Sequence, residues 1–354
     1  MDCKKIRIAK WCQCWESCIR FTGDSIRYTR GSTSVVGEGI YRLASSDTVW
    51  KVKNSGLNTL GVSSLGADQK NNIIYAGTYK EGAYRFRDTD TMWQHIDTTS
   101  LTDGHLTCFL VDTLNGYTYA GTWSGIFRST NFGTTWARLG NSTTFIVMTM
   151  AINSKGYIFA GSSNYGVFRS TNNGIDWVPK NPVMMDSLAT NIVVNSKDIV
   201  YANTQGGIFS STNNGDSWTA LSGNLRRTTY LGLDADQYLY AGTNAGSIYR
   251  TISSTATGVS VDLSLEVVGY RLDNNYPNPF NPVTTIAFDV PKSTYVSLII
   301  YDCLGRYVAT VANRKYISGH HEERFDASKQ SSGIYFYKLQ AGSYTSVKKM
   351  VVIK

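Results

Sequence analysis

Histidine is the side chain best suited to acid–base chemistry near neutral pH, and this chain holds few of them. The four histidines are His95, His105, His320 and His321. Their spacing fits neither a Ser-His-Asp arrangement nor a pair of metal ligands on one element. The histidines therefore predict no catalytic site.

Cysteine could bind a metal, and four of the six cysteines crowd at the start of the chain. These four are Cys3, Cys12, Cys14 and Cys18. Zinc sites commonly show two matched pairs of ligands, and this Cys-x-Cys-x-x-x-Cys run has no second pair. We predict no metal and no other cofactor, with zinc as the alternative. Cys108 and Cys303 lie in apolar segments, and we expect both to be small buried hydrophobic residues.

Five arginines occupy equivalent positions in a repeated Gly-aromatic-Arg unit, which invites comparison with a catalytic arginine cluster. They are Arg42, Arg85, Arg128, Arg169 and Arg250. A catalytic cluster needs unlike residues that converge from different repeats, so we expect these identical arginines to donate hydrogen bonds between neighbouring repeats. The repeats contain only two glutamates, Glu38 and Glu81, both beside a repeated glycine. The sequence thus predicts no catalytic residue.

Aromatic side chains just before the repeated glycines could bind sugars. Tyr79, Trp123 and Tyr165 stand in loops at equivalent positions of successive repeats. Such rings could line one face of the protein and stack on sugar rings, since Tyr and Trp combine an apolar face with a polar group. Ordinary loop packing is the alternative. We take these three residues as candidate ligand contacts.

The elements that position these residues repeat about every forty residues. The repeated glycines, at spacings of 43, 43, 41, 41 and 39 residues, are Gly39, Gly82, Gly125, Gly166, Gly207 and Gly246. A tryptophan follows each of the first five after eleven residues, at Trp50, Trp93, Trp136, Trp177 and Trp218. Such a period without a helical pattern predicts propeller blades of four strands each. We therefore predict an all-β chain with a six-bladed β-propeller over residues 1–252.

Three connections between the third and fourth strands of a repeat share the motif Ser-Thr-Asn-x-Gly-x-x-Trp. Its fixed positions are Asn131, Gly133, Trp136, Asn172, Gly174, Trp177, Asn213, Gly215 and Trp218. The motif resembles the Asp-box, or BNR-type repeat, of sialidase-like propellers, and the whole repeat also resembles photosystem-assembly-factor-like propellers. Asn replaces Asp here and keeps a carbonyl oxygen for backbone N–H groups, while Gly takes a positive φ. Trp is expected to fill the seam between blades and to find a partner for its indole N–H. The Asp-box is a folding device, so the resemblance does not imply sialidase activity.

The sixth repeat lacks an outer strand before the chain becomes a linker. Residues 5–12 are a candidate closing strand, because Trp11 lies one repeat, 39 residues, before Trp50. A strand shared between the two ends of the propeller would remove two open edges. The alternative is a seventh blade in the intact protein. Residues 1–31 are an atypical start without the apolar core of a signal peptide, and we expect the true start to lie upstream.

The end of the chain carries four ordered blocks. The residues that mark them are Tyr276, Pro277, Asn278, Pro279, Phe280, Asn281 and Pro282, followed by Gly305, Gly333, Lys348 and Lys349. Proline fixes φ and lacks an N–H, so the first block is a stiff lead-in rather than a helix or a central strand. Short strands separated by glycine turns follow. They predict a small immunoglobulin-like β-sandwich over residues 265–354.

These four blocks resemble the type A C-terminal sorting domain of cargo proteins of the bacterial type IX secretion system. The resemblance implies export by the type IX machinery and removal of the domain by a sortase-like peptidase. Cleavage would fall near residues 253–264, whose Ser/Thr-rich composition is typical of an exposed linker. We therefore expect the protein to be secreted or to lie on the outer cell surface.

The net charge of +8 is confined to the two ends of the chain. Residues 1–31 hold seven basic and three acidic groups, residues 272–354 hold ten and six, and the remainder is neutral. A protein that binds nucleic acid would concentrate basic charge on its binding module, so we predict no nucleic-acid partner. The sequence also has no apolar run of about eighteen residues, and we expect no transmembrane segment.

Together these features favour a secreted or cell-surface propeller that acts as a non-catalytic binding or scaffold module. Surface polysaccharide or another protein would be its partner. An Asp-box-type glycoside hydrolase acting on extracellular polysaccharide is the alternative. A structural envelope protein without a ligand is a third interpretation.

Overall fold

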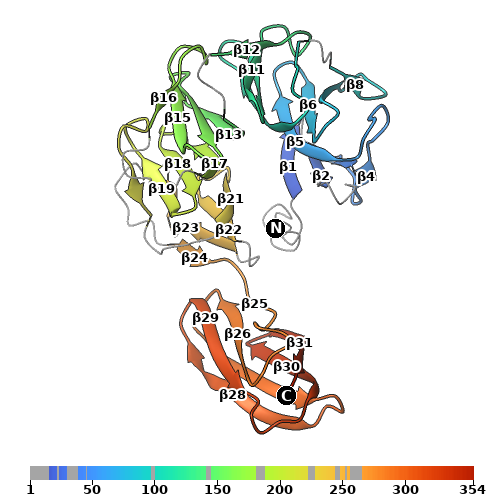
Figure 1. Ribbon diagram of the computed structural model, residues 1–354, viewed down its shortest axis with the longest axis vertical. Coiled ribbons are helices and arrows are strands. Elements are labelled where there is room, and N and C mark those ends of the chain that lie inside the picture. Colours follow the sequence, from blue (N-terminus) through green and yellow to red (C-terminus); the bar gives the residue numbers. More distant parts are fainter. Residues whose placement is uncertain are drawn as a thin grey trace. The chain divides into compact units, whose positions relative to one another are not determined.

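The computed structural model describes eleven stretches of the chain. They are residues 16–21, 24–29, 39–44, 46–96, 100–140, 145–180, 188–221, 228–243, 248–251, 253–255 and 265–354. The described residues are all-β and contain no α-helix. Six four-stranded sheets of a β-propeller come first, and a β-sandwich of two sheets follows (Figure 1). The predicted fold class is confirmed.

The strands of each propeller sheet are neighbours in chain order. The first two blades contain β1 (Glu16–Phe21), β2 (Asp24–Thr29), β3 (Gly39–Leu43), β4 (Lys51–Val52), β5 (Val62–Asp68), β6 (Ile73–Thr78), β7 (Ala83–Arg87) and β8 (Gln94–His95). The next two contain β9 (Leu106–Asp112), β10 (Tyr117–Thr122), β11 (Gly125–Ser129), β12 (Ala137–Leu139), β13 (Val147–Ile152), β14 (Ile158–Ser162), β15 (Val167–Ser170) and β16 (Val178–Pro179). The last two contain β17 (Ala189–Val194), β18 (Val200–Thr204), β19 (Gly207–Ser211), β20 (Thr219–Ala220), β21 (Thr228–Leu233), β22 (Leu239–Thr243), β23 (Ile248–Thr251) and β24 (Leu265–Val267).

Glycines on the second strand of a blade lie where the first strand of the next blade comes closest. A Cβ atom on Gly77 would lie 2.7 Å from the Cβ of Leu106, and one on Gly121 would lie 2.9 Å from Cγ1 of Val147. Neither gap admits a methyl group, because close-packed interiors leave no such room. The repeated Ala-Gly pair is therefore required by the packing of blade against blade.

The cores of the propeller form between consecutive blades. Tyr75 of the second blade shares one buried cluster with Phe127 and Trp136 of the third. Four of the repeated tryptophans donate the indole N–H to a backbone carbonyl oxygen, as the sequence predicts. The acceptors, at 2.8–3.2 Å, are Lys53 for Trp93, Gly133 for Trp136, Gly174 for Trp177 and Lys180 for Trp218.

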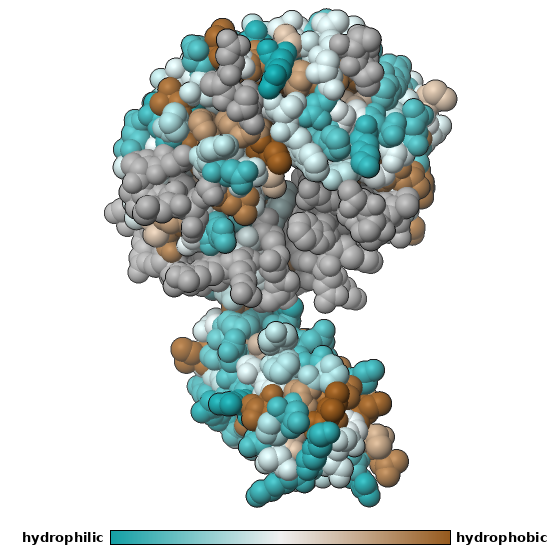
Figure 2. All heavy atoms as spheres, viewed as in Figure 1, coloured by the Kyte–Doolittle hydropathy of each residue, from teal (hydrophilic) through white to brown (hydrophobic). Residues whose placement is uncertain are grey.

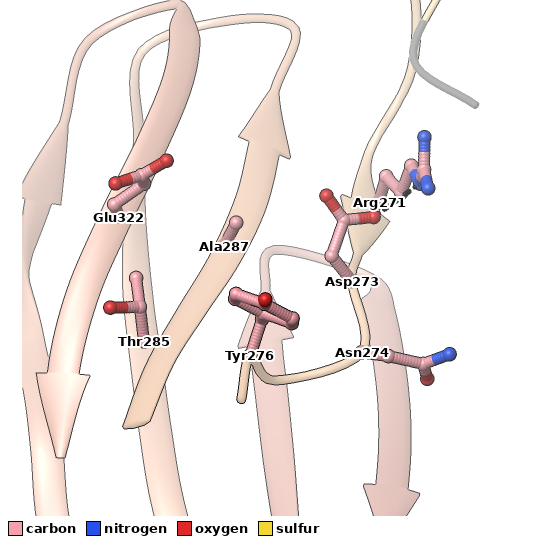
Figure 3. Close-up of a pocket in the computed structure, with 7 residues that line it drawn as sticks. All are labelled: Arg271, Asp273, Asn274, Tyr276, Thr285, Ala287 and Glu322. Atoms are coloured by element: carbon pink, nitrogen blue, oxygen red, sulfur yellow. Dashed lines mark ion pairs between the residues drawn. The ribbon is translucent and has the colours of Figure 1, made fainter. Parts of the chain in front are cut away.

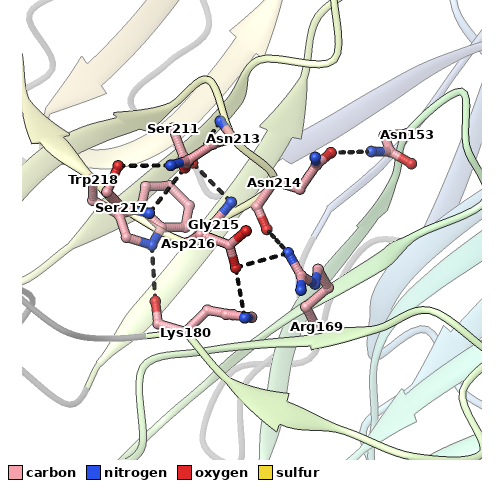
Figure 4. Close-up of polar contacts among 10 residues, drawn as sticks. All are labelled: Asn153, Arg169, Lys180, Ser211, Asn213, Asn214, Gly215, Asp216, Ser217 and Trp218. Atoms are coloured by element: carbon pink, nitrogen blue, oxygen red, sulfur yellow. Dashed lines mark hydrogen bonds and ion pairs between the residues drawn. The ribbon is translucent and has the colours of Figure 1, made fainter.

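The turn between the third and fourth strands is held by its own polar side chains (Figure 4). In the fifth blade, Ser211 Oγ accepts the N–H of Gly215 at 2.7 Å, and Asn213 Oδ1 accepts the N–H of Ser217 at 2.9 Å. Asn214 and Gly215 both have positive φ, of 59° and 86°. The same two side-chain bonds recur in the third and fourth blades. The expected role of the Asn carbonyl oxygen in these turns is confirmed.

The repeated arginines join one blade to the next. Arg42 pairs with Asp88 at 3.0 Å, and Arg85, Arg128 and Arg169 each donate to the following blade's turn. These four confirm the prediction of hydrogen-bond donors between blades. Arg250 differs, because it pairs with Glu266 of its own sheet.

The first and sixth sheets contain strands that the sequence does not predict. β1 and β2 come from the atypical start, residues 1–31. In the sixth sheet β24 pairs with β23, as Leu265 lies opposite Thr251. The outer position expected for residues 5–12 is therefore filled by residues 265–267, which the sequence assigns to the sorting domain. Residues 5–12 themselves lie outside the described residues. A three-residue strand carries no periodic signal, so sequence reasoning could not find it.

The chain forms two compact units, each made of two separate segments. One contains Met1–Gln237 and Thr255–Asp262, and the other contains Tyr238–Ser254 and Leu263–Lys354.

The sandwich packs two antiparallel sheets around one core. Its strands are β25 (Arg271–Leu272), β26 (Val283–Val290), β27 (Thr294–Asp302), β28 (Tyr307–Tyr316), β29 (Gly319–Asp326), β30 (Gly333–Ala341) and β31 (Tyr344–Val352). The sheet orders are β25-β26-β29 and β28-β27-β30-β31. Inward side chains such as Phe288, Leu298 and Tyr337 are fully buried. This alternation of buried and exposed positions follows from the two-residue period of a strand.

The two remaining cysteines differ in their surroundings. Cys108 packs, partly buried, against the core between the third and fourth blades, and burial raises the pKa of its thiol to about 12. Cys303 is exposed, which corrects the expectation of a buried residue. It lies in the turn after β27, where Asp302 accepts the backbone N–H groups of Leu304 and Arg306. Cys303 is exposed because it lies in this turn, just after the apolar strand β27 has ended.

The surface of each unit mixes hydrophilic and apolar side chains, as the face in Figure 2 shows. The sandwich exposes several large apolar residues, among them Tyr276, Tyr307, Ile334 and Val347. Among the described residues, no helix could cross a lipid bilayer.

Candidate functional site

The candidate ligand contacts and the Ser-Thr-Asn-x-Gly turns lie at opposite ends of the strands in each blade. The strands of each blade are antiparallel and lie in chain order. The connection between strands two and three is therefore at one end of the strands, and the connection between strands three and four is at the other end. Tyr79, Trp123 and Tyr165 follow the second strand of their blades, and the Ser-Thr-Asn-x-Gly turns follow the third. The three aromatic candidates are therefore on the opposite side of the blades from the turns that stabilise the fold.

Tyr79 and Trp123 meet in an aromatic cluster with His105. The rings of Tyr79 and Trp123 are 5.4 Å apart and nearly perpendicular. The ring of His105 stacks on Trp123 with a centroid distance of 4.5 Å and an interplanar angle of 15°. Trp123 is 42% exposed. We call Tyr79, His105 and Trp123 the aromatic platform.

Asp103 holds this platform in place. Its Oδ1 accepts the backbone N–H of His105 at 2.9 Å and lies 3.2 Å from Nδ1 of the same ring. Its Oδ2 accepts the N–H of Ser124, the residue after Trp123, at 2.8 Å. The carboxylate thereby joins the loop before β9 to the loop after β10. Rigid support of this kind keeps exposed rings in one orientation.

The pKa of Asp103 fits this role. Partial burial by itself would raise it, but the hydrogen bonds from His105 and Ser124 outweigh burial and lower the pKa below its usual value. The carboxylate is therefore ionised at neutral pH. A general acid needs the opposite shift, so Asp103 is suited to positioning rather than to proton transfer.

Tyr165 does not belong to the platform. It is 59% exposed, and its ring lies 6.2 Å from that of Phe145, which stacks on Phe168. The structure thus brings two of the three candidates together and places the third beside a different pair of rings. Sequence reasoning missed His105 and Asp103, because neither recurs in the other repeats.

Of the histidines and glutamates considered as acids or bases, His105 belongs to the platform, and Glu81 lies two residues after Tyr79 in the same loop. Glu81 is exposed, and its carbonyl oxygen lies 2.8 Å from Nε2 of His95. Glu38 lies outside the described residues. Within the described parts of the chain, no group of three His, Cys, Asp or Glu side chains could hold a metal ion.

The proline-rich lead-in of the sandwich crosses to its last strand. Tyr276 is 82% exposed, whereas Phe280 is buried and packs near Phe325. The N–H of Phe280 donates to the carbonyl oxygen of Val351 at 3.1 Å, and Asn278 Oδ1 accepts the N–H of Val351 at 2.9 Å. The lead-in is therefore fixed to β31 as well as to β26.

The other marker residues of the sandwich lie in turns and on β30 and β31. Gly305 has a φ of 78° in the turn after β27, and Gly333 begins β30. Lys348 Nζ donates to Asn274 Oδ1 at 2.9 Å, and Lys349 is exposed.

An open pocket of about 510 Å³ lies beside the lead-in (Figure 3). Tyr276, Asp273 and Arg271 line one side, and Ala287, Thr285 and Glu322 line the other. Arg271 Nε forms an ion pair of 2.6 Å with Asp273.

Comparison with protein families agrees with this description of the C-terminal region. Residues 274–354 match the model of the secretion system C-terminal sorting domain. They are a type IX C-terminal sorting domain. The domain indicates export to the cell surface or secretion, and it implies interaction with the secretion machinery. Residues 145–268 match the DUF6242 beta propeller domain, a range that includes β24.

Solved propeller structures are similar to this chain at low sequence identity. PorZ of Porphyromonas gingivalis, a surface component of the type IX secretion system, matches with 14% identity and a TM-score of 0.51 over 95% of this chain and 51% of its own. YCF48 bound to D1 peptide matches with 14% identity and a TM-score of 0.53 over 77% of this chain and 93% of its own. The extracellular domain of the putative hybrid two-component system BT3049 of B. thetaiotaomicron matches with 12% identity and a TM-score of 0.54, over 95% and 55%.

These similarities show the fold alone. The chain spans about half the length of PorZ. No curated protein sequence matches the chain.

Proposed function

We propose that the propeller is a non-catalytic binding module that contacts a sugar or polysaccharide outside the cell through the aromatic platform. One observation carries the proposal: the partly exposed ring of Trp123, stacked on His105 and held from two loops by Asp103. Exposed aromatic rings bind the apolar faces of sugars, and pre-orientation lowers the entropic cost of binding.

The alternative is a glycoside hydrolase of the Asp-box type. The Ser-Thr-Asn-x-Gly-x-x-Trp turns favour kinship with Asp-box propellers, and a polysaccharide would be the substrate. A hydrolase needs a protonated acid beside a second carboxylate. The lowered pKa of Asp103 makes the carboxyl group at the platform unsuited to that role.

Proteins are a further partner class for this module. A propeller of similar fold, YCF48, has been solved bound to a peptide. We place sugars first, since the platform offers flat ring faces rather than an open strand edge.

The sorting domain would be removed by cleavage near residues 253–264, through a sortase-like peptidase of the secretion system. The proposal rests on the sorting domain at residues 274–354. The mass of the protein recovered from the cell surface or the medium would test it. A species that retains residues 274–354 would contradict it.

A glycan array and a panel of fluorogenic glycosides, both applied to the purified full chain, would separate the two functions. We expect binding to one class of glycan without release of fluorophore. Turnover of any glycoside that is lost in a carboxylate variant would establish the hydrolase instead.

A further inference from the structure

The last strand of the sandwich has one edge without a neighbouring strand. β31 ends the sheet order β28-β27-β30-β31. Val351 shows which backbone groups point to this edge, since its N–H and carbonyl oxygen bond Asn278 and Phe280 rather than β30. Backbone direction alternates along a strand, so Thr345, Val347 and Lys349 point to the same edge.

The lead-in covers only the C-terminal part of that edge. Phe280 bonds the carbonyl oxygen of Val351 and the N–H of Ile353, and Asn278 Nδ2 reaches the carbonyl oxygen of Lys349 at 3.5 Å. In the described chain, the N–H groups of Thr345, Val347 and Lys349 find no backbone acceptor. Residues 344–349 therefore form an open edge next to a covered one.

The surface beside the open edge is apolar and basic. Register places Tyr301, Phe336 and Lys349 in one row across three strands, and Ile299, Lys338 and Val347 in the next. Val347 is 55% exposed. Neither Lys338 nor Lys349 forms an ion pair with any described residue. Two lysines and a strip of apolar side chains thus border a row of backbone N–H groups that have no backbone acceptor.

We propose that residues 344–349 are a docking edge that accepts an extended, acidic strand of a partner protein. Strand addition would satisfy the open backbone groups, and acidic side chains on the added strand would pair with Lys338 and Lys349. A second copy of this chain fits poorly, because edge-to-edge pairing would bring two basic edges of like charge together, each with its own Lys338 and Lys349. The partner meets the protein during export, since the edge belongs to the sorting domain.

Export of the full chain in a host with a type IX system tests this docking edge. Val347→Pro removes one outward N–H and leaves the bonds to β30, and Val347→Thr is the matched control that keeps the N–H. We expect about a tenfold lower yield at the cell surface or in the medium for the proline variant only. The melting temperature of the purified variants checks that both fold.

A second pair of variants keeps the test decisive if the proline disturbs folding. Lys349→Glu should reduce export more than Lys349→Gln, because only Glu repels an acidic strand. Equal export of folded Val347→Pro and Val347→Thr, or of both Lys349 variants, would overturn the proposal. So would self-association of the wild type that Val347→Pro abolishes, since the occupant would then be a second copy. None of these substitutions lies in the propeller, so glycan binding should persist in all four.

Discussion

Arg169 in the fourth blade donates a hydrogen bond of 2.7 Å from Nη1 to the carbonyl oxygen of Asn214 in the fifth blade. Asn214 is one of two adjacent residues of positive φ in this turn, with Gly215. Arg128 makes the same bond to Asn173 of the next blade at 2.9 Å. Each bond ties a turn whose backbone is conformationally costly to a charged donor from the preceding blade. The turns therefore act between blades as well as within them.

Arg169→Ala should destabilise the propeller by about 1.5–3 kcal/mol, the range for a hydrogen bond to a charged group. The side chain also bonds Asp216 at 3.1 Å and lies over the ring of Tyr157. In thermal unfolding of the full chain, the melting temperature of the transition assigned to the propeller should fall. Lys155→Ala, at an exposed site of the same blade, is the control and should leave the transition unchanged.

Gly174→Ala should cost more stability than Gly215→Ala. Both glycines have positive φ, of 82° and 86°, so both substitutions carry a backbone cost of about 1 kcal/mol. A Cβ on Gly174 would lie 2.6 Å from Leu139 Cδ1, whereas one on Gly215 would meet Lys180 Cβ at 3.4 Å. Overpacking should add about 1–3 kcal/mol at Gly174 alone. Equal urea midpoints for the two variants would argue against this packing.

Asn172→Asp should destabilise its turn, and Asn131→Asp should not. Asn172 Nδ2 donates to Asp176 Oδ2 at 2.8 Å, so the substitution would set two carboxylates against each other. Asn131 Nδ2 instead faces the hydroxyl of Thr135 at 2.9 Å, which can donate to a carboxylate. We expect a cost of about 1 kcal/mol or less for the exposed Asn172 site. The difference in melting temperature should shrink in about 1 M salt, where such charges are screened.

Stability of the sandwich should fall as the pH rises above neutrality. The hydrogen bond from His320 Nδ1 to Asp289, 2.6 Å long, raises the pKa of His320, although partial burial opposes it. The charged imidazole therefore stabilises the fold fully below the unfolded pKa of about 6.5. This contribution is lost as the pH rises through the higher folded pKa. Urea midpoints at pH 6 and about pH 8.5 should differ for the wild type and converge in His320→Gln. If His320→Gln kept the full difference between the two urea midpoints, the pH dependence of stability would not come from His320.

The repeat carried most of the fold prediction. A tryptophan eleven residues after each of the first five repeated glycines marked the blades. The arginine and indole hydrogen bonds were predictable because repeated polar groups in a packed fold need partners. Single features were not predicted: β24 has only three residues, and β2 lacks the Ala-Gly pair found on the second strand of most other blades.

The candidate site was only half predictable. Tyr79 and Trp123 recur at equivalent loop positions, so their sequence positions were informative. His105 and Asp103 have no counterparts in the other repeats. They meet Trp123 because the loop before β9 and the loop after β10 lie at the same end of the strands. The open edge of β31 depends on the path of the lead-in after Asn275, which no local pattern specifies.

Binding of the array-selected glycan to three forms of the full chain tests the central claim most directly. Trp123→Ala should weaken binding at least about tenfold, as the loss of one stacked ring predicts. Tyr165→Ala, which alters an exposed ring outside the platform, should bind as the wild type does. Equal affinity of Trp123→Ala and wild type, measured by titration calorimetry, would contradict the account.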